Sequence, residues 1–188
     1  MKKLTTAALT LLLIGCGGLG KAGPQAALYD FGIAPGEPAV TLPLRLAEVE
    51  AAPGLEGAEM RYRLAYQNPA RVFAYTESRW AAPPEKLLAR RLEQRLLSAG
   101  PGQCTLRVTL ETFDQVFDKP DSSRGVVRLF ATLSLAGVRS PAVQTSVATE
   151  HAAQSADARG GVAALTTATD NAIAQLLVWA QAECSGSK

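Results

Sequence analysis

The residue with the clearest chemical signature is Cys16, which directly follows Leu13–Gly15. A cationic start and a short apolar stretch over residues 4–14 precede it. A positive start, an apolar stretch and small residues before a cysteine are typical of a bacterial lipoprotein signal. The sequence therefore predicts that residues 1–15 are a signal peptide. The Cys16 thiol would become a thioether to diacylglycerol, and Cys16 would be the acylated first residue of the mature chain.

Two other interpretations of the N-terminal segment remain open. An ordinary cleaved signal peptide could end nearby, because Gly15, Gly17 and Gly18 are all small. A buried core helix is the second alternative, although the glycines around Cys16 would interrupt it. The apolar stretch is too short to cross a bilayer, which takes about 20 apolar residues. If the lipoprotein interpretation holds, several acyl chains anchor the protein durably, since each buried methylene contributes about 0.8 kcal/mol.

The other two cysteines, Cys104 and Cys184, are the smallest set that can pair in an oxidising compartment. A disulfide between them would close a long loop and could stabilise the fold by about 4 to 5 kcal/mol in the chain-entropy model. The alternative is two buried thiols that pack as small apolar side chains. No cysteine or histidine spacing of a metal site is evident, so we expect neither a metal nor a cofactor.

Residues that could perform acid–base or nucleophilic catalysis are sparse. The one histidine, His151, falls at the end of a predicted strand, where a surface or packing role is the ordinary explanation. Asp114 and Asp118 flank a predicted hairpin turn, which favours solvated charge over paired acid–base work. The sequence carries no G-x-S-x-G, H-E-x-x-H or P-loop pattern. We therefore expect that the protein is not an enzyme.

Aromatic side chains concentrate in about one tenth of the chain, at Tyr62, Tyr66, Phe73, Tyr75 and Trp80. One interpretation is core packing. The other is an apolar surface or groove that contacts a partner protein or an acyl chain. On the second interpretation, Tyr62, Tyr75 and Trp80 are the candidate contact residues.

The charge of the mature chain argues against nucleic acid as a partner. Removal of residues 1–15 takes away Lys2 and Lys3 and no acidic residue, so the nineteen basic residues fall to the number of acidic ones, seventeen. No basic run remains that could bind phosphates. The 173 residues that follow suffice for one domain, which we place at residues 28–188 behind a Gly- and Ala-rich tether, residues 16–27.

Hydrophobic periodicity predicts an α+β fold with a mainly antiparallel sheet and two main helices packed against it. The first helix starts at Pro83-Pro84, and its apolar stripe runs through Leu96 and Ala99. The second helix covers roughly residues 158–182. Alternation predicts strands over residues 28–32, 40–49 (with an edge position or bend at Pro43), 60–66 and 72–80, then an antiparallel meander over 106–115, 127–135 and 143–149.

Short motifs follow the predicted lipidation site in a distinctive order. They are a Tyr-containing strand at 28–32, Arg61-Tyr62-Arg63, Tyr75, Trp80 followed by Pro83-Pro84, Phe113-Asp114 and Leu177-Val178-Trp179. This order resembles the ABC-type transport auxiliary lipoproteins, the family that includes the PqiC-type membrane-integrity lipoproteins. The chain departs from the family at Ala82, where an acidic residue is common, and the Cys104–Cys184 pair is not a family feature.

The resemblance implies a periplasmic α+β domain that works beside an ABC permease, its ATPase and an MCE-domain protein. Such systems move lipids or other apolar molecules between membranes. Residue 17 is glycine and not the aspartate that commonly retains lipoproteins in the inner membrane, so the resemblance favours an outer-membrane anchor facing the periplasm. Self-assembly into a homo-oligomer is compatible with this role. A self-contained lipid carrier and a structural envelope lipoprotein are the two alternative functions.

Overall fold

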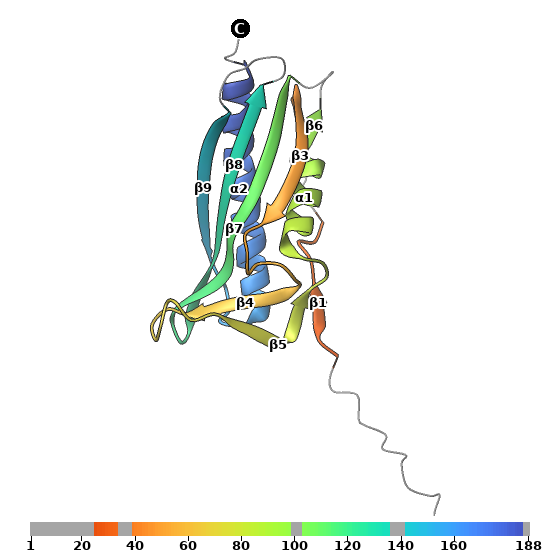
Figure 1. The fold of residues 1–188 in the computed structure, drawn as a ribbon. Helices are drawn as coiled ribbons and strands as arrows, with labels where there is room; N and C mark the ends of the chain where they lie inside the picture. The colour runs from red at the N-terminus through yellow and green to blue at the C-terminus, as the bar shows by residue number, and fades with distance from the viewer. Residues whose placement is uncertain (1–24, 34–38, 99–102, 136–141, 186–188) are drawn as a thin grey trace, which may run out of the picture.

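A computed structural model describes residues 25–33, 39–98, 103–135 and 142–185. Cys16, the signal peptide and most of the predicted tether lie outside the described residues. The described strands are β1 (Ala27–Tyr29), β2 (Val40–Leu42), β3 (Leu44–Ala51), β4 (Glu59–Leu64), β5 (Phe73–Trp80), β6 (Leu96–Ser98), β7 (Cys104–Lys119), β8 (Ser122–Leu135) and β9 (Val143–Ala152), and the helices are α1 (Pro84–Arg95) and α2 (Ala158–Ser185). They form one α+β domain with both helices packed on the sheet, which confirms the predicted fold class (Figure 1).

The sheet is mixed in strand direction. Its order is β1-β5-β4-β7-β8-β9, and β3 pairs with β7 off this path. The meander β7-β8-β9 is antiparallel as predicted. The β4–β5 pair is also antiparallel. β3 and β4 run parallel to β7, and β1 runs parallel to β5. Strand periodicity carries no information on partner direction, which explains why the parallel pairs were not predicted.

Strand β7 organises the sheet because two other strands share one of its edges. Its first half, from Cys104 to Leu110, pairs with β3, and its second half, from Gln115 to Phe117, pairs with β4. The opposite edge pairs with β8 along almost the whole length of both strands. A register shift between Leu110 and Thr112 separates the two halves.

The predicted strand over residues 40–49 is divided in two at Pro43. Proline has no N–H to donate to a ladder, and it commonly marks a strand end or a bulge. β2 therefore ends at Leu42 and joins β6 in a separate two-stranded sheet, while β3 begins at Leu44 and joins β7. The Pro43 carbonyl accepts a hydrogen bond from the Cys104 N–H at 3.1 Å, at the point where β3 meets β7.

Helix α1 starts where predicted but ends earlier. Pro83 and Pro84 occupy the N-cap and the first turn, with Glu85 favourably placed near the positive end of the helix dipole. Leu96 has extended backbone angles, φ −116° and ψ 117°, and pairs with Val40 in the β2–β6 sheet. The predicted helical stripe was thus wrong at Leu96, and Ala99 lies outside the described residues. Leu96 is buried in either conformation, so its apolar character did not reveal the strand.

Helix α2 lies along the sheet face formed by β7, β8 and β9 (Figure 1). Small residues, among them Ala164, Ala168 and Ala172, are buried on its inner side and permit a close approach. At Gly125 of β8, an added Cβ would lie 2.5 Å from the backbone nitrogen of Leu165. A side chain at residue 125 would therefore push the helix away from the sheet.

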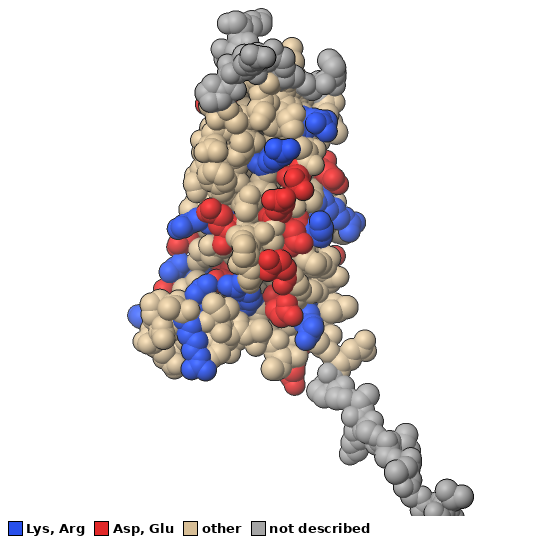
Figure 2. All heavy atoms as spheres, in the orientation of Figure 1, with Lys and Arg blue, Asp and Glu red and all other residues tan. Residues whose placement is uncertain are grey.

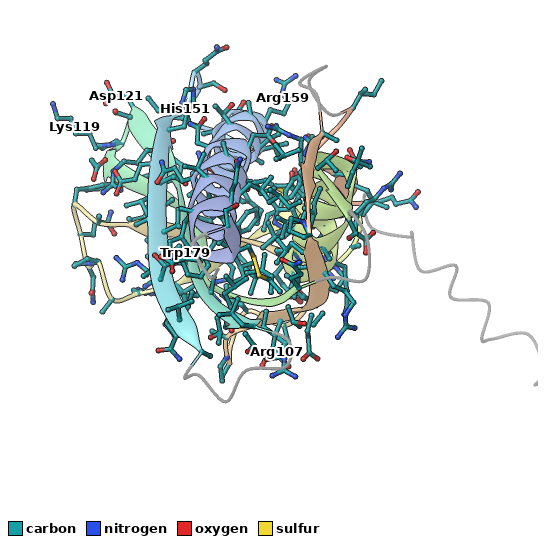
Figure 3. All side chains as sticks on the ribbon, turned by 90° about the horizontal axis from the view of Figure 1, so that it is seen from above. Arg107, Lys119, Asp121, His151, Arg159 and Trp179 are labelled. Carbon is teal, nitrogen blue, oxygen red and sulfur yellow. A yellow bond between two sulfur atoms is a disulfide. The ribbon has the colours of Figure 1, made fainter. Side chains whose placement is uncertain are left out.

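A disulfide joins Cys104 to Cys184, as the pairing prediction proposed, with 6.1 Å between their Cα atoms. It ties the start of β7 to the last turn of α2, and its sulfur atoms are enclosed by the core (Figure 3). The two cysteines are 80 residues apart in sequence. Because loop-closure entropy grows with the length of the closed loop, a bridge of this span belongs to the more stabilising kind.

We expect the double variant Cys104→Ala/Cys184→Ala to lose about 4 kcal/mol of unfolding free energy, since the unfolded chain regains the entropy of the open loop. Urea unfolding monitored by circular dichroism measures this loss. Wild-type protein unfolded in the presence of a reductant should approach the stability of the double variant. An unchanged unfolding midpoint in both samples would contradict the stabilising role.

Candidate functional site

Two of the three aromatic contact candidates meet at one end of the sheet. Tyr62 of β4 lies 4.7 Å from Tyr75 and 5.2 Å from Phe73, measured between ring centroids. Phe117 of β7 completes the group at 5.9 Å from Tyr62. We call Tyr62, Phe73, Tyr75 and Phe117 the aromatic cluster. Its rings are partly or largely buried, so it supports the sheet end from which more exposed apolar side chains project.

Those exposed side chains belong to the segment that joins β4 to β5. Tyr66 is 42% exposed and Val72 is 41% exposed, and the two lie at opposite ends of this segment. Arg71 places its guanidinium 4.5 Å from the centroid of the Phe73 ring, a cation–π contact. The aromatic cluster therefore anchors a loop with an apolar surface and one nearby cation.

Trp80, the third candidate, lies in the core. It is 2% exposed and contacts Phe31 and Phe113, with ring centroids 5.8 Å and 5.3 Å away. In this structure its ring is covered by its own chain and is not presented to a partner. Of the two interpretations, core packing therefore describes Trp80. The residue ends β5 next to the start of α1, where the sheet is covered.

Asp114 is buried at the centre of this sheet end, 1% exposed, between two arginines of β4. Arg63 Nε donates a hydrogen bond to Asp114 Oδ2 at 2.6 Å. Arg61 Nε lies 3.0 Å from Oδ1 as an ion pair whose geometry does not form a hydrogen bond. The prediction of solvated charge was therefore wrong for Asp114 and right for Asp118, which is exposed and pairs with Arg124. Asp114 lies on the face of β7 opposite Gln115, where Arg61 and Arg63 cover it.

The alternation Arg61-Tyr62-Arg63 was the signal that could have revealed this ion-pair centre. Residues two apart on a strand share one face, so both arginines point to the same side of the sheet. Two cations on a partly buried face require an anion, and Asp114 supplies it. The sequence could not identify that anion because β4 and β7 are far apart along the chain.

A buried hydrogen-bond network connects the aromatic cluster to the start of α2. Tyr75 Oη donates to Gln115 Oε1 at 3.0 Å, and Gln115 Nε2 donates to Ser123 Oγ at 2.8 Å and to the Asp157 carbonyl at 3.1 Å. Asp157 in turn caps α2, because its Oδ1 accepts the Gly160 N–H at 2.8 Å. That hydrogen bond is the main reason why the pKa of Asp157 is lowered, followed by the bond from the Ser155 hydroxyl.

Burial raises the pKa of Tyr75 to about 12, and the negative charges of ionised Tyr62 and of Asp157 add to the effect. At physiological pH the phenol is therefore a hydrogen-bond donor that holds Gln115 in place. This describes a positioning role and requires no proton transfer.

The remaining candidates stay apart from this site. His151 is exposed near the end of β9, and Figure 3 shows it at the same end of the molecule as Asp121 and Arg159. In the described part of the chain no three histidine, cysteine, aspartate or glutamate side chains gather as metal ligands. Neither described helix has the length and apolar character needed to cross a membrane.

Comparison with known proteins identifies the fold. No family model matches the chain, and no curated protein resembles it in sequence. Among solved structures, protein XCC0632 of Xanthomonas campestris, a member of the DUF330 family, superposes with a TM-score of 0.64 at 16% identity, covering 83% of this chain and 91% of its own. An uncharacterised protein superposes with a TM-score of 0.64 at 17% identity, covering 82% and 98%. This chain has the fold of these proteins.

The Asp114→Asn variant should be less stable than wild type by about 2 to 4 kcal/mol, because it leaves two partly buried arginines without their anion. The matched control is Asp118→Asn on the same strand. Its ion pair with Arg124 is largely exposed, so its loss should cost under about 1 kcal/mol. Urea unfolding of both variants measures the difference, and equal losses would refute a special role for Asp114.

Stability should fall as the pH rises from about 10 toward 12, because the folded protein holds the Tyr75 proton more tightly than the unfolded chain does. The stabilisation is complete below the unfolded pKa and is lost as the pH passes the folded one. Tyr75→Phe removes this titration, so its unfolding free energy should depend less on pH across that window. Denaturant unfolding at several alkaline pH values compares the two proteins, and parallel profiles would count against a raised pKa.

Proposed function

We propose that this protein is a non-enzymatic, lipid-anchored accessory subunit of an ABC transport system that contains an MCE-domain protein. It would sit on the periplasmic face of the outer membrane, and the system would move lipids or other apolar molecules across the envelope. The permease and ATPase would complete the transporter in the inner membrane. The protein would need no cofactor of its own.

The observation that carries this proposal is the combination of a lipoprotein-type Cys16 with the ordered motifs of the domain. Those motifs resemble the auxiliary lipoproteins of ABC transporters, and the domain shares the fold of a DUF330 protein. DUF330 is the family of PqiC-like proteins. The motif residues also have identifiable structural roles here: Tyr62 anchors the aromatic cluster, Arg61 and Arg63 hold Asp114, and Trp80 fills the core.

An anchored docking role also suits the chemistry of the surface. The β4–β5 connection offers apolar side chains, Tyr66 and Val72, on a rigid support. The support is rigid because Asp114 and Gln115 fix β4, β7 and α2 to one another. Tyrosine is enriched among the residues that dominate the binding energy of protein–protein contacts, which makes Tyr66 a suitable contact residue.

Replacement of Cys16 by serine should leave the domain folded and abolish function in cells, because the protein would lose its lipid anchor. Complementation of a deletion strain measures function, and membrane fractionation measures anchoring. Formation of the Cys104–Cys184 disulfide reports that the domain still folds. A soluble Cys16→Ser protein that complements fully would overturn the positional role.

The proposed partners are tested by crosslinking the native protein in cells and identifying what is recovered with it. We expect an MCE-domain protein or a permease subunit. The double variant Tyr66→Ser/Val72→Ser should recover less of the partner, whereas Thr76→Ala on the neighbouring exposed surface should recover the wild-type amount. Recovery of no transporter subunit under gentle crosslinking would count heavily against the proposal. Retention of stoichiometric lipid after purification without detergent would instead favour a lipid carrier.

A further inference from the structure

Strand β3 has an open edge. One edge pairs in parallel with β7 from Leu44 to Ala51, and among the described strands none pairs with the other. An unpaired strand edge presents N–H and C=O groups that can accept another strand. The Ala47 bulge, where the register shifts between Leu46 and Glu48, bends the strand without closing this edge.

The open edge borders a groove of about 550 Å³ whose opposite wall is helix α1. Every residue from Leu46 to Ala51 lines the groove, so a continuous stretch of the strand borders it. From α1 the lining residues are Glu85, Lys86, Ala89 and Glu93, which lie along one side of the helix. A groove between a strand edge and a helix is the geometry in which an extended peptide adds as a further strand.

The groove carries a large excess of negative charge. Its lining includes five glutamates and one lysine: Glu48, Glu50, Glu56, Glu85, Glu93 and Lys86. In the described part of the chain, no ion pair joins any of these glutamates to a cation. Figure 2 shows acidic atoms gathered over the region where Figure 1 draws β3 beside α1.

Both walls of the groove contribute carboxylates. Glu48 and Glu50 flank the buried Val49 and therefore share the outer face of β3, whereas Glu85 and Glu93 come from the helix. Glu85 Oε2 is buried and has no hydrogen-bond partner. A buried acceptor without a donor is costly, and a donor brought by a ligand would satisfy it.

We propose that this groove binds an extended, basic segment of a partner protein, which adds as a strand to the open edge of β3. Backbone hydrogen bonds to β3 would hold the segment, and lysine or arginine side chains would pair with the glutamates. Six residues of β3 line the groove, so the bound segment is about six residues, or about 20 Å, long. Its amino acids would alternate, because only every second side chain faces the same wall.

This proposal deepens the accessory role by giving the partner a chemistry, and it rests on that role only for the partner's identity. The negative charge of the edge also argues against a second copy of this chain as the bound partner. Like charges opposite each other destabilise strand pairing, so Glu48 and Glu50 oppose the pairing of β3 with a second copy of itself. The edge therefore disfavours pairing with β3 of a second copy and favours pairing with a segment of opposite charge.

The test is a titration of the full-length chain, held in nonionic detergent, with a capped hexapeptide of alternating lysine and valine. Isothermal calorimetry gives the affinity, and amide hydrogen exchange over residues 46–51 reports pairing at the edge. We expect saturable binding that protects those amides of this stretch that point to the open edge. Glu48→Lys/Glu50→Lys should weaken binding at least about tenfold, whereas the matched double reversal Glu77→Lys/Asp121→Lys, at exposed positions outside the groove, should leave it unchanged.

A second peptide separates strand addition from simple attraction of charge. It has the same sequence with alternate backbone nitrogens methylated, which keeps every lysine but removes hydrogen-bond donors. Strand addition predicts that this peptide binds at least about tenfold more weakly. Equal binding of the two peptides, or equal weakening by the two double reversals, would overturn the proposal. No transporter subunit is present in this experiment, so its failure would leave the proposed function standing, and failure of the crosslinking test would leave the groove's specificity intact.

Discussion

The structure depends on the close packing of α2 against the hairpin of β7 and β8. Buried alanines on the helix and Gly125 on β8 let the two backbones approach within van der Waals contact. The Gln115–Asp157 hydrogen bond fixes the first turn of the helix, and the Cys104–Cys184 disulfide fixes its last turn. A long helix held at both ends gives the sheet a rigid back, which allows the other face and the edges of the sheet to serve in contacts.

Strand β7 transmits this rigidity to the rest of the domain. Because β3 and β4 share one of its edges, the strand carries two surfaces of different chemistry. The β4 end is aromatic and is centred on the buried Asp114, and the β3 end is acidic and open. The open edge of β3 lies beside α1, and the aromatic cluster anchors the β4–β5 loop that carries Tyr66 and Val72.

The proposed role joins these surfaces to the anchor at Cys16. A lipid holds a chain at a membrane but gives it no orientation, and the domain must supply the specific contacts. The two surfaces would have different tasks in binding a partner. The small apolar projection would contribute affinity, and the charged strand edge would select the charge and the strand direction of the partner segment. In the proposed role, the protein would be a fixed point in the envelope to which a moving or extended partner attaches.

The sequence by itself determined the α+β class, the start of α1 and the order and antiparallel direction of the β7–β8–β9 meander, and it offered the pairing of the two cysteines in the domain as one of two alternatives. These features follow from local patterns: alternation, helical spacing, proline at a helix start, and a cysteine count with one possible pair. It also offered the aromatic residues as candidates, and Tyr62 and Tyr75 do meet.

Tertiary structure alone decided the remaining features, because each depends on residues distant in sequence. Leu96 belongs to strand β6 and not to α1 because its backbone pairs with Val40. Trp80 was buried because Phe31 and Phe113 cover it, and Asp114 became an ion-pair centre because β4 lies beside β7. The groove also depends on residues that are distant in sequence. Its glutamates come from β3, α1 and the segment before β4, and they act together only because the parallel β3–β7 pairing leaves one strand edge open beside the helix.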